Sequence, residues 1–144
     1  MSEEPVDLLR RESRSLVQRL RLWTPARWAA GAEPYGTRAD LVRHLAQALA
    51  DTAARLEGQP LRDLPRLDDL GVADQLAVVS DDLVRVRPAE HLTRAVTAHL
   101  LLHRRDLLGE DVPPGLAAAL GLDDVVAAGT TICEESGRTP LGRT

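Results

Sequence analysis

Residues 88–108 read PAEHLTRAVTAHLLLHRRDLL, and this stretch decides the fold class of the chain. Apolar side chains recur in it at the spacing of an α-helix, at Leu92, Val96, Leu100 and Leu107. Pro88 suits the first turn of a helix, and Gly109 is a natural residue to end one. The pattern therefore predicts a long amphipathic helix that must bury one face against other helices.

Three further amphipathic stretches, at residues 6–23, 37–56 and 72–86, predict the partners of this helix. In the second stretch, Thr37 and Asp40 form a weaker variant of the capping box that begins many helices. Each stretch leaves an apolar stripe that only helix-on-helix packing can cover. We therefore expect an all-α fold, a four-helix bundle.

The rest of the chain is expected to form loops and short helical pieces. They are, in order, a loop or broken short helix at 26–35, an ordered loop at 59–71, a short extra C-terminal helix at 113–120 and a further turn at 123–128. We expect a single domain over residues 1–144, with its core at about 6–109 and the short helix and a polar tail at 110–144.

Composition and charge narrow the classes of function. Aromatic residues make up only 2% of the chain and Phe is absent, so the core must consist of Leu, Val and Ala. The formal net charge of -4 argues against nucleic-acid binding. No apolar run approaches the ~20 residues that cross a bilayer, which argues against a membrane protein. The acidic, polar start MSEEPVDLL is unlike a secretion signal, so we expect a cytoplasmic location.

Three of the four histidines stand out by their spacing. His99 and His103 are four residues apart, so both imidazoles project from one face of the predicted helix. His44 borders the apolar face of the second predicted helix. If these two helices run antiparallel, the three imidazoles converge in the interior and can share one metal ion. Three protein ligands leave coordination positions open, which is typical of catalytic sites. The alternative is a set of core histidines that hydrogen bonds satisfy without metal.

Two segments resemble a known family. Residues 37–46, TRADLVRHLA, resemble the second-helix motif of the DinB-like superfamily, and residues 99–107, HLLLHRRDL, are similar to its fourth-helix motif. The resemblance is closest to the actinobacterial branch that includes the mycothiol-dependent maleylpyruvate isomerases. The sequence departs from the family at Tyr35 and Gly36, where relatives often carry a Trp before the helix cap. It also lacks the long C-terminal domain of the full isomerases.

The resemblance implies a DinB-like four-helix bundle with a divalent metal at His44, His99 and His103, and it implies a homodimer. We expect zinc or nickel, because imidazole suits both. Characterised relatives are S-transferases or isomerases that use a low-molecular-weight thiol. The implied partners are therefore mycothiol as co-substrate and an electrophilic small molecule. Two classes remain open: such a metal-dependent enzyme, or a non-catalytic helical bundle with a binding or regulatory role.

The remaining candidate residues carry weaker expectations. Asp106 follows His103 by three residues and is either an acceptor that orients a ligand imidazole or a solvated acid at a helix end. We expect His91 to lie on the surface in the first turn of its helix. Trp23 and Trp28 are expected to pack across the loop that contains Pro25. Two glutamates follow the only cysteine, Cys133, which makes it an improbable nucleophile.

Overall fold

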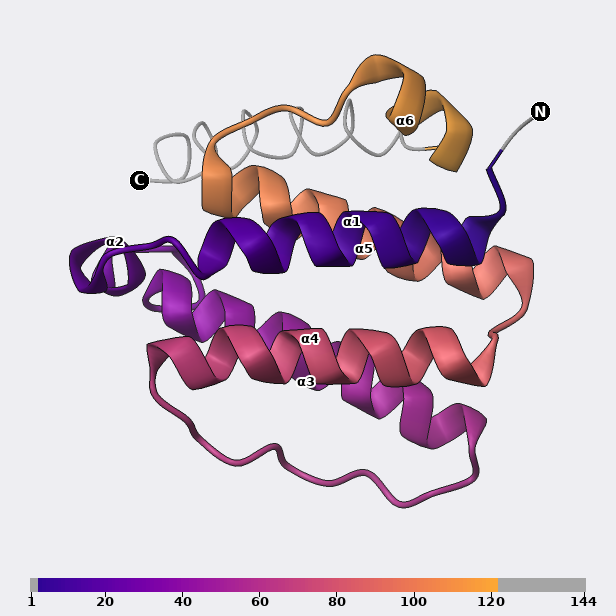
Figure 1. Ribbon diagram of the computed structural model, residues 1–144, viewed down its shortest axis with the longest axis horizontal. Coiled ribbons are helices and arrows are strands. Elements are labelled where there is room, and N and C mark those ends of the chain that lie inside the picture. The colour runs from indigo at the N-terminus through magenta and orange to yellow at the C-terminus, as the bar shows by residue number, and fades with distance from the viewer. Residues whose placement is uncertain (1–2, 122–144) are drawn as a thin grey trace, which may run out of the picture. The chain divides into compact units, whose positions relative to one another are not determined.

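The computed structural model describes residues 3–121, and in this range the chain is helical, without a strand (Figure 1). The helices are α1 (Pro5–Leu20), α2 (Pro25–Ala29), α3 (Arg38–Leu56), α4 (Asp69–Val86), α5 (Glu90–Leu108) and α6 (Pro114–Leu120). The expectation of an all-α fold is confirmed. The turn expected at 123–128 and the cysteine at position 133 lie outside the described residues.

The four long helices pack side by side around one apolar core. α3 packs against α4 and α5, and α1 packs against the same two helices. Figure 1 shows α3 and α4 running in one direction and α1 and α5 in the opposite direction. The fully buried leucines are Leu9, Leu16, Leu20, Leu41, Leu45, Leu49, Leu76, Leu83, Leu100, Leu101 and Leu107. Each contributes roughly 1.5–3 kcal/mol by leaving water, so leucine supplies most of the core in place of aromatic residues.

The connection between α3 and α4 runs back along these two helices, because they are parallel (Figure 1). The side chain of Gln47 on α3 holds this connection at two points. Its Nε2 donates to the carbonyl oxygen of Arg62 at 2.9 Å, and its Oε1 accepts from the backbone N–H of Leu64 at 2.9 Å. Gln75 on α4 donates to the carbonyl oxygen of Pro65 at 3.0 Å. The segment is therefore an ordered loop, as expected, although it ends earlier than position 71.

Local capping explains where the helices begin and end. The capping box of Thr37 and Asp40 is present, with both of its hydrogen bonds. α4 begins three residues before the expected position, because the Asp68 side chain accepts from the backbone N–H of Gly71 at 2.8 Å and caps the helix there. α1 ends at Leu20 and not at position 23, since the chain turns there into the extended Thr24 that precedes a proline.

The chain divides after Asp111 into two units, and α6 belongs to the second. The short C-terminal helix is present at Pro114–Leu120, one residue later than expected. Among residues 3–121, no helix combines the length and the apolar character needed to span a membrane.

Candidate metal centre

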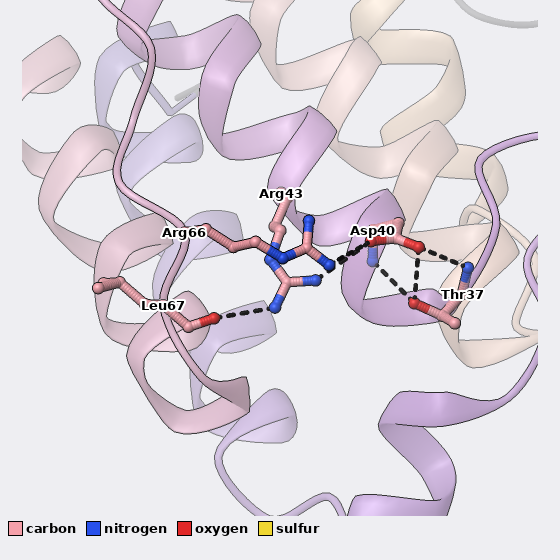
Figure 2. A network of polar contacts seen from close by, with 5 residues as sticks. All are labelled: Thr37, Asp40, Arg43, Arg66 and Leu67. Carbon is pink, nitrogen blue, oxygen red and sulfur yellow. Dashed lines mark hydrogen bonds and ion pairs between the residues drawn. The ribbon is translucent and has the colours of Figure 1, made fainter.

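The start of α3 is fixed by a polar network that Figure 2 shows. The Asp40 carboxylate accepts from the backbone N–H and the hydroxyl of Thr37, each at 3.0 Å. Arg43 and Arg66 approach the same carboxylate from the other side, at 3.2 and 3.7 Å. The backbone hydrogen bond from Thr37 holds the pKa of Asp40 below its usual value, although partial burial acts in the opposite direction. The first turn of α3, which leads into His44, is therefore tightly held.

The structure brings the three predicted histidines together between α3 and α5. One nitrogen from each of His44, His99 and His103 lies within 4.8 Å of the others. The ring centroids of His99 and His103 are 4.1 Å apart, and those of His44 and His103 are 5.7 Å apart. This follows from the antiparallel course of α3 and α5, which sets the early part of one beside the late part of the other.

The tautomer of His103 follows from one hydrogen bond. Its Nδ1 lies 2.8 Å from the carbonyl oxygen of His99. A carbonyl oxygen can only accept, so Nδ1 carries the hydrogen. The Nε2 atom of the neutral ring then has a free lone pair. This Nε2 is buried without a hydrogen-bond partner, and so is the Nε2 of His99.

Burial keeps the inner imidazoles neutral. Burial, with the neighbouring rings of His103 and His44, lowers the pKa of His99 to about 4. Burial also lowers the pKa of His103, although the hydrogen bond to the His99 carbonyl and the Asp106 carboxylate act in the opposite direction. Neutral imidazole is the form that binds metal ions. Both inner rings are thus in the ligand form at neutral pH.

The arrangement fits a divalent cation. A buried polar atom without a partner costs about 1–3 kcal/mol, and two residues of this cluster, His99 and His103, each carry such a nitrogen. Nitrogens bound to one zinc ion at about 2.1 Å are at most ~4.2 Å apart, so small side-chain rotations suffice within a cluster spanning 4.8 Å. His44 is exposed and His103 is buried, so the cluster opens to solvent on the His44 side.

The hydrogen bond that orients His103 is made by the carbonyl oxygen of His99, so of the two roles considered for Asp106 the geometry favours the solvated acid at a helix end. Asp106 is exposed and lies 3.7 Å from the guanidinium of Arg105. The reason is the helical position: the carbonyl four residues earlier lies directly beside the His103 ring, whereas Asp106 begins the next turn at the surface. The charge of Asp106 raises the pKa of His103, against the larger lowering by burial.

Other expected positions are confirmed. His91 is exposed in the first turn of α5. Trp23 and Trp28 are both buried and pack edge to face, with ring centroids 5.0 Å apart.

Tyr35 is a residue that the sequence did not single out as part of the site. Its ring centroid lies 4.8 Å from that of His44 and 5.8 Å from that of His103. Tyr35 comes from the loop before α3, where no helical periodicity predicts the direction of a side chain. The one sequence signal for Tyr35 is that it lies two residues before Thr37, the cap of the helix that carries His44.

Comparison with known proteins found no matching family model, no matching curated protein and no matching solved structure. The functional interpretation therefore depends on the geometry of the histidine cluster and on the motif resemblance.

Proposed function

We propose that the chain is a DinB-like four-helix bundle that binds one divalent metal ion, zinc or nickel, through His44, His99 and His103. One observation carries the proposal: His99 and His103 each have a buried nitrogen without a hydrogen-bond partner, and both residues offer a ligand nitrogen within 4.8 Å of one from His44. No protein group among the described residues pairs with these nitrogens, and an unpaired buried nitrogen is costly. An ion bound there would satisfy both of them.

Each of the three histidines would have a different role in binding the ion. His99 and His103 supply neutral nitrogens from one helix face, and the carbonyl oxygen of His99 fixes the orientation of His103. The exposed His44 completes the ligand set from α3 and leaves one side open to solvent. A bound divalent ion supplies positive charge that stabilises a thiolate or activates a ligand water.

For the reaction, we propose an S-transferase or isomerase that uses a low-molecular-weight thiol such as mycothiol with an electrophilic small molecule. The motifs at 37–46 and 99–107 support this class. We also propose an actinobacterial source, which the motif resemblance implies, and a cytoplasmic location. A second candidate is a bundle without catalytic activity that has a binding or regulatory role. It is favoured by the composition of the cluster, which among the described residues contains three histidines and no carboxylate to act as a base.

Metal binding is tested by titrating purified, chelator-treated protein with zinc and measuring the bound metal by elemental analysis. We expect about one ion per chain for the wild type and none for His103→Ala. The matched control is His91→Ala, which removes an exposed histidine from the same helix and should retain the ion. A wild type that binds no zinc or nickel contradicts the proposal.

Catalysis is tested separately with the metal-loaded protein. Consumption of a thiol in the presence of an electrophile, absent from His103→Ala, supports the enzyme. Stoichiometric metal without thiol transfer supports the non-catalytic candidate.

We also propose a homodimer, which the motif resemblance implies. Light scattering at micromolar concentration should give twice the 15.7 kDa mass of the chain. A monomeric mass contradicts this proposal and leaves the metal site unaffected.

A further inference from the structure

We propose that Tyr35 is a positioning residue that holds His44 in its ligand orientation by ring packing. The inference rests on the proposed metal site and adds to it a residue outside the histidine set. It addresses a specific difficulty of that site, which is the exposure of one ligand.

The three histidines are held unequally by the helices. His103 is 6% exposed and is fixed by its hydrogen bond to the carbonyl oxygen of His99. His99 lies one turn earlier on the same helix and is half-buried. His44 is exposed, so the core does not restrict its side-chain rotamers. An exposed imidazole loses rotamer freedom when it binds an ion, unless a neighbour already restricts it.

Tyr35 is that neighbour. Its ring is tilted by 45° to the ring of His44, at a centroid distance of 4.8 Å, and by 48° to the ring of His103. Such tilted contacts lie within the preferred range for aromatic pairs. His44 also stacks on His103, at a centroid distance of 5.7 Å with 13° between the ring planes, and Tyr35 lies 5.8 Å from His103, so the three rings form a triangle. The His44 ring thus contacts two rings that also contact each other, one from the loop and one from α5.

The loop that carries Tyr35 is itself well fixed. The backbone N–H of Tyr35 donates to the carbonyl oxygen of Ala32 at 2.9 Å, and the N–H of Ala32 donates to that of Gly36 at 2.8 Å. Gly36 has a φ of +108°, and a Cβ there would lie 2.7 Å from an Asp40 carboxylate oxygen. The turn is therefore seated directly on the capping box of α3. The Tyr35 ring on this turn therefore has a defined place relative to His44, which lies in the second turn of α3.

The proposal assigns the effect to the ring and not to the hydroxyl. The contacts of Tyr35 with His44 and His103 are ring contacts, and the residue is 37% exposed. Phe can make the same contacts, whereas Ala cannot. Residues that orient a metal ligand typically change metal affinity by about 10- to 100-fold when they are removed.

The experiment compares wild type, Tyr35→Ala and Tyr35→Phe in zinc competition with a chromophoric chelator. We expect about tenfold weaker binding for Tyr35→Ala and near wild-type binding for Tyr35→Phe. Leu22→Ala is the control, since it removes an apolar side chain that is 84% exposed, from the turn after α1. Circular dichroism melts verify the fold of each variant, and Tyr35→Leu replaces Tyr35→Ala if the latter does not fold.

A second readout separates ligand positioning from general stability. The visible absorption spectrum of the cobalt(II)-substituted protein reports the geometry of the ligands. The spectrum should change in Tyr35→Ala and return to that of the wild type in Tyr35→Phe.

Wild-type affinity and spectrum in Tyr35→Ala overturn the inference. Equal losses in Tyr35→Ala and Tyr35→Phe overturn the assignment to the ring. If the wild type itself binds no metal, the proposed function fails and this inference fails with it. If only the Tyr35 variants behave as wild type while His44→Ala loses metal, this inference alone fails.

Discussion

The Nδ1 atom of His103 lies 2.8 Å from the carbonyl oxygen of His99, four residues earlier on α5. This contact uses the backbone of one candidate ligand to orient the side chain of the other. It also leaves the Nε2 of His103 deprotonated, buried and without a partner. A helix spacing of four residues therefore fixes two things at once, the common face of the two imidazoles and the tautomer of one of them.

The first prediction concerns the balance between stability and metal binding at this position. His103→Leu replaces an unsatisfied polar atom in the core by an apolar side chain of comparable size. We expect the metal-free protein to gain about 1–2 kcal/mol in its free energy of unfolding, because the desolvation cost of the unpaired nitrogen disappears. The same variant should bind no metal. Urea unfolding in excess chelator measures the stability change.

The matched control is His91→Leu, on the exposed side of the same helix, which should leave stability within about 0.5 kcal/mol of the wild type. A metal-free His103→Leu protein that is clearly less stable than the wild type would show that His103 serves core packing.

The second prediction concerns the effect of pH on the metal-free protein. The pKa of His99 is about 4 in the folded chain, compared with an ordinary value of 6.5. Because the folded pKa is the lower one, the unfolded chain binds more protons in this window, and stability falls as the pH falls. The contribution of His99 is fully present above pH 6.5 and is lost progressively as the pH falls toward 4. Urea midpoints at several pH values measure this slope.

His99→Leu should have a flatter pH dependence over that range, while His91→Ala should keep the slope of the wild type. An unchanged slope in His99→Leu contradicts the assignment. With zinc present, the loss should begin at a higher pH, since protons compete with the metal for the imidazoles.

Much of the fold could be predicted from the sequence, because helical periodicity and caps are local signals. The apolar spacing in residues 88–108 predicts α5, and the pair Thr37 and Asp40 predicts where α3 begins. The start of α4 was placed too late, since Gly71 reads as a break, whereas Asp68 caps its backbone N–H and places it inside the helix. The end of α1 was placed too late, because apolar periodicity continues past Leu20 into a turn.

The candidate site was predictable where it depends on helix geometry and not where it depends on loops. His99 and His103 share a face by spacing alone, and the antiparallel course of two helices was enough to bring in His44. Tyr35 could not be placed, because its direction depends on a hydrogen-bonded turn between α2 and α3. For a related reason the sequence left two roles open for Asp106. The acceptor beside the His103 ring is a backbone carbonyl, which every sequence supplies and no side-chain pattern reveals.

The third prediction tests how the Tyr35 turn is joined to α3. Gly36→Ala places a Cβ 2.7 Å from an Asp40 carboxylate oxygen, at a φ of +108° that side chains rarely adopt. The carboxylate cannot move away without losing its hydrogen bonds to Thr37. We expect a loss of about 2–3 kcal/mol, the sum of backbone strain and a weakened cap. Chemical denaturation measures it.

Gly58→Ala is the matched comparison, since it has a φ of +66° but no atom within 4 Å of the added Cβ. It should cost only the backbone strain, about 1 kcal/mol. Equal losses at the two glycines would show that the contact with Asp40 is unimportant.

The fourth prediction concerns Gln47, which holds the long connection between α3 and α4 in place. Its amide donates to the carbonyl oxygen of Arg62 and accepts from the N–H of Leu64, both at 2.9 Å. Gln47→Ala removes both bonds, and we expect a loss of about 1–2 kcal/mol in global stability.

The larger effect of Gln47→Ala should be local, in the connection itself. Trypsin should cleave after Arg62 or Arg66 sooner than in the wild type, because cleavage requires the segment to leave the helices. The double variant Gln47→Glu with Asp51→Asn separates the two bonds, since a carboxylate can still accept from Leu64 but cannot donate to the Arg62 carbonyl. The change at Asp51 is needed because the Nε2 of Gln47 also donates to Asp51 Oδ1 at 2.8 Å, and two carboxylates would repel each other there. The double variant should be cleaved at an intermediate rate. The metal content of all three proteins should remain equal, because position 47 is not one of the candidate ligands and the capping box of Thr37 and Asp40 stays in place. Wild-type cleavage rates in Gln47→Ala would mean that packing of the segment, and not these two hydrogen bonds, keeps it ordered.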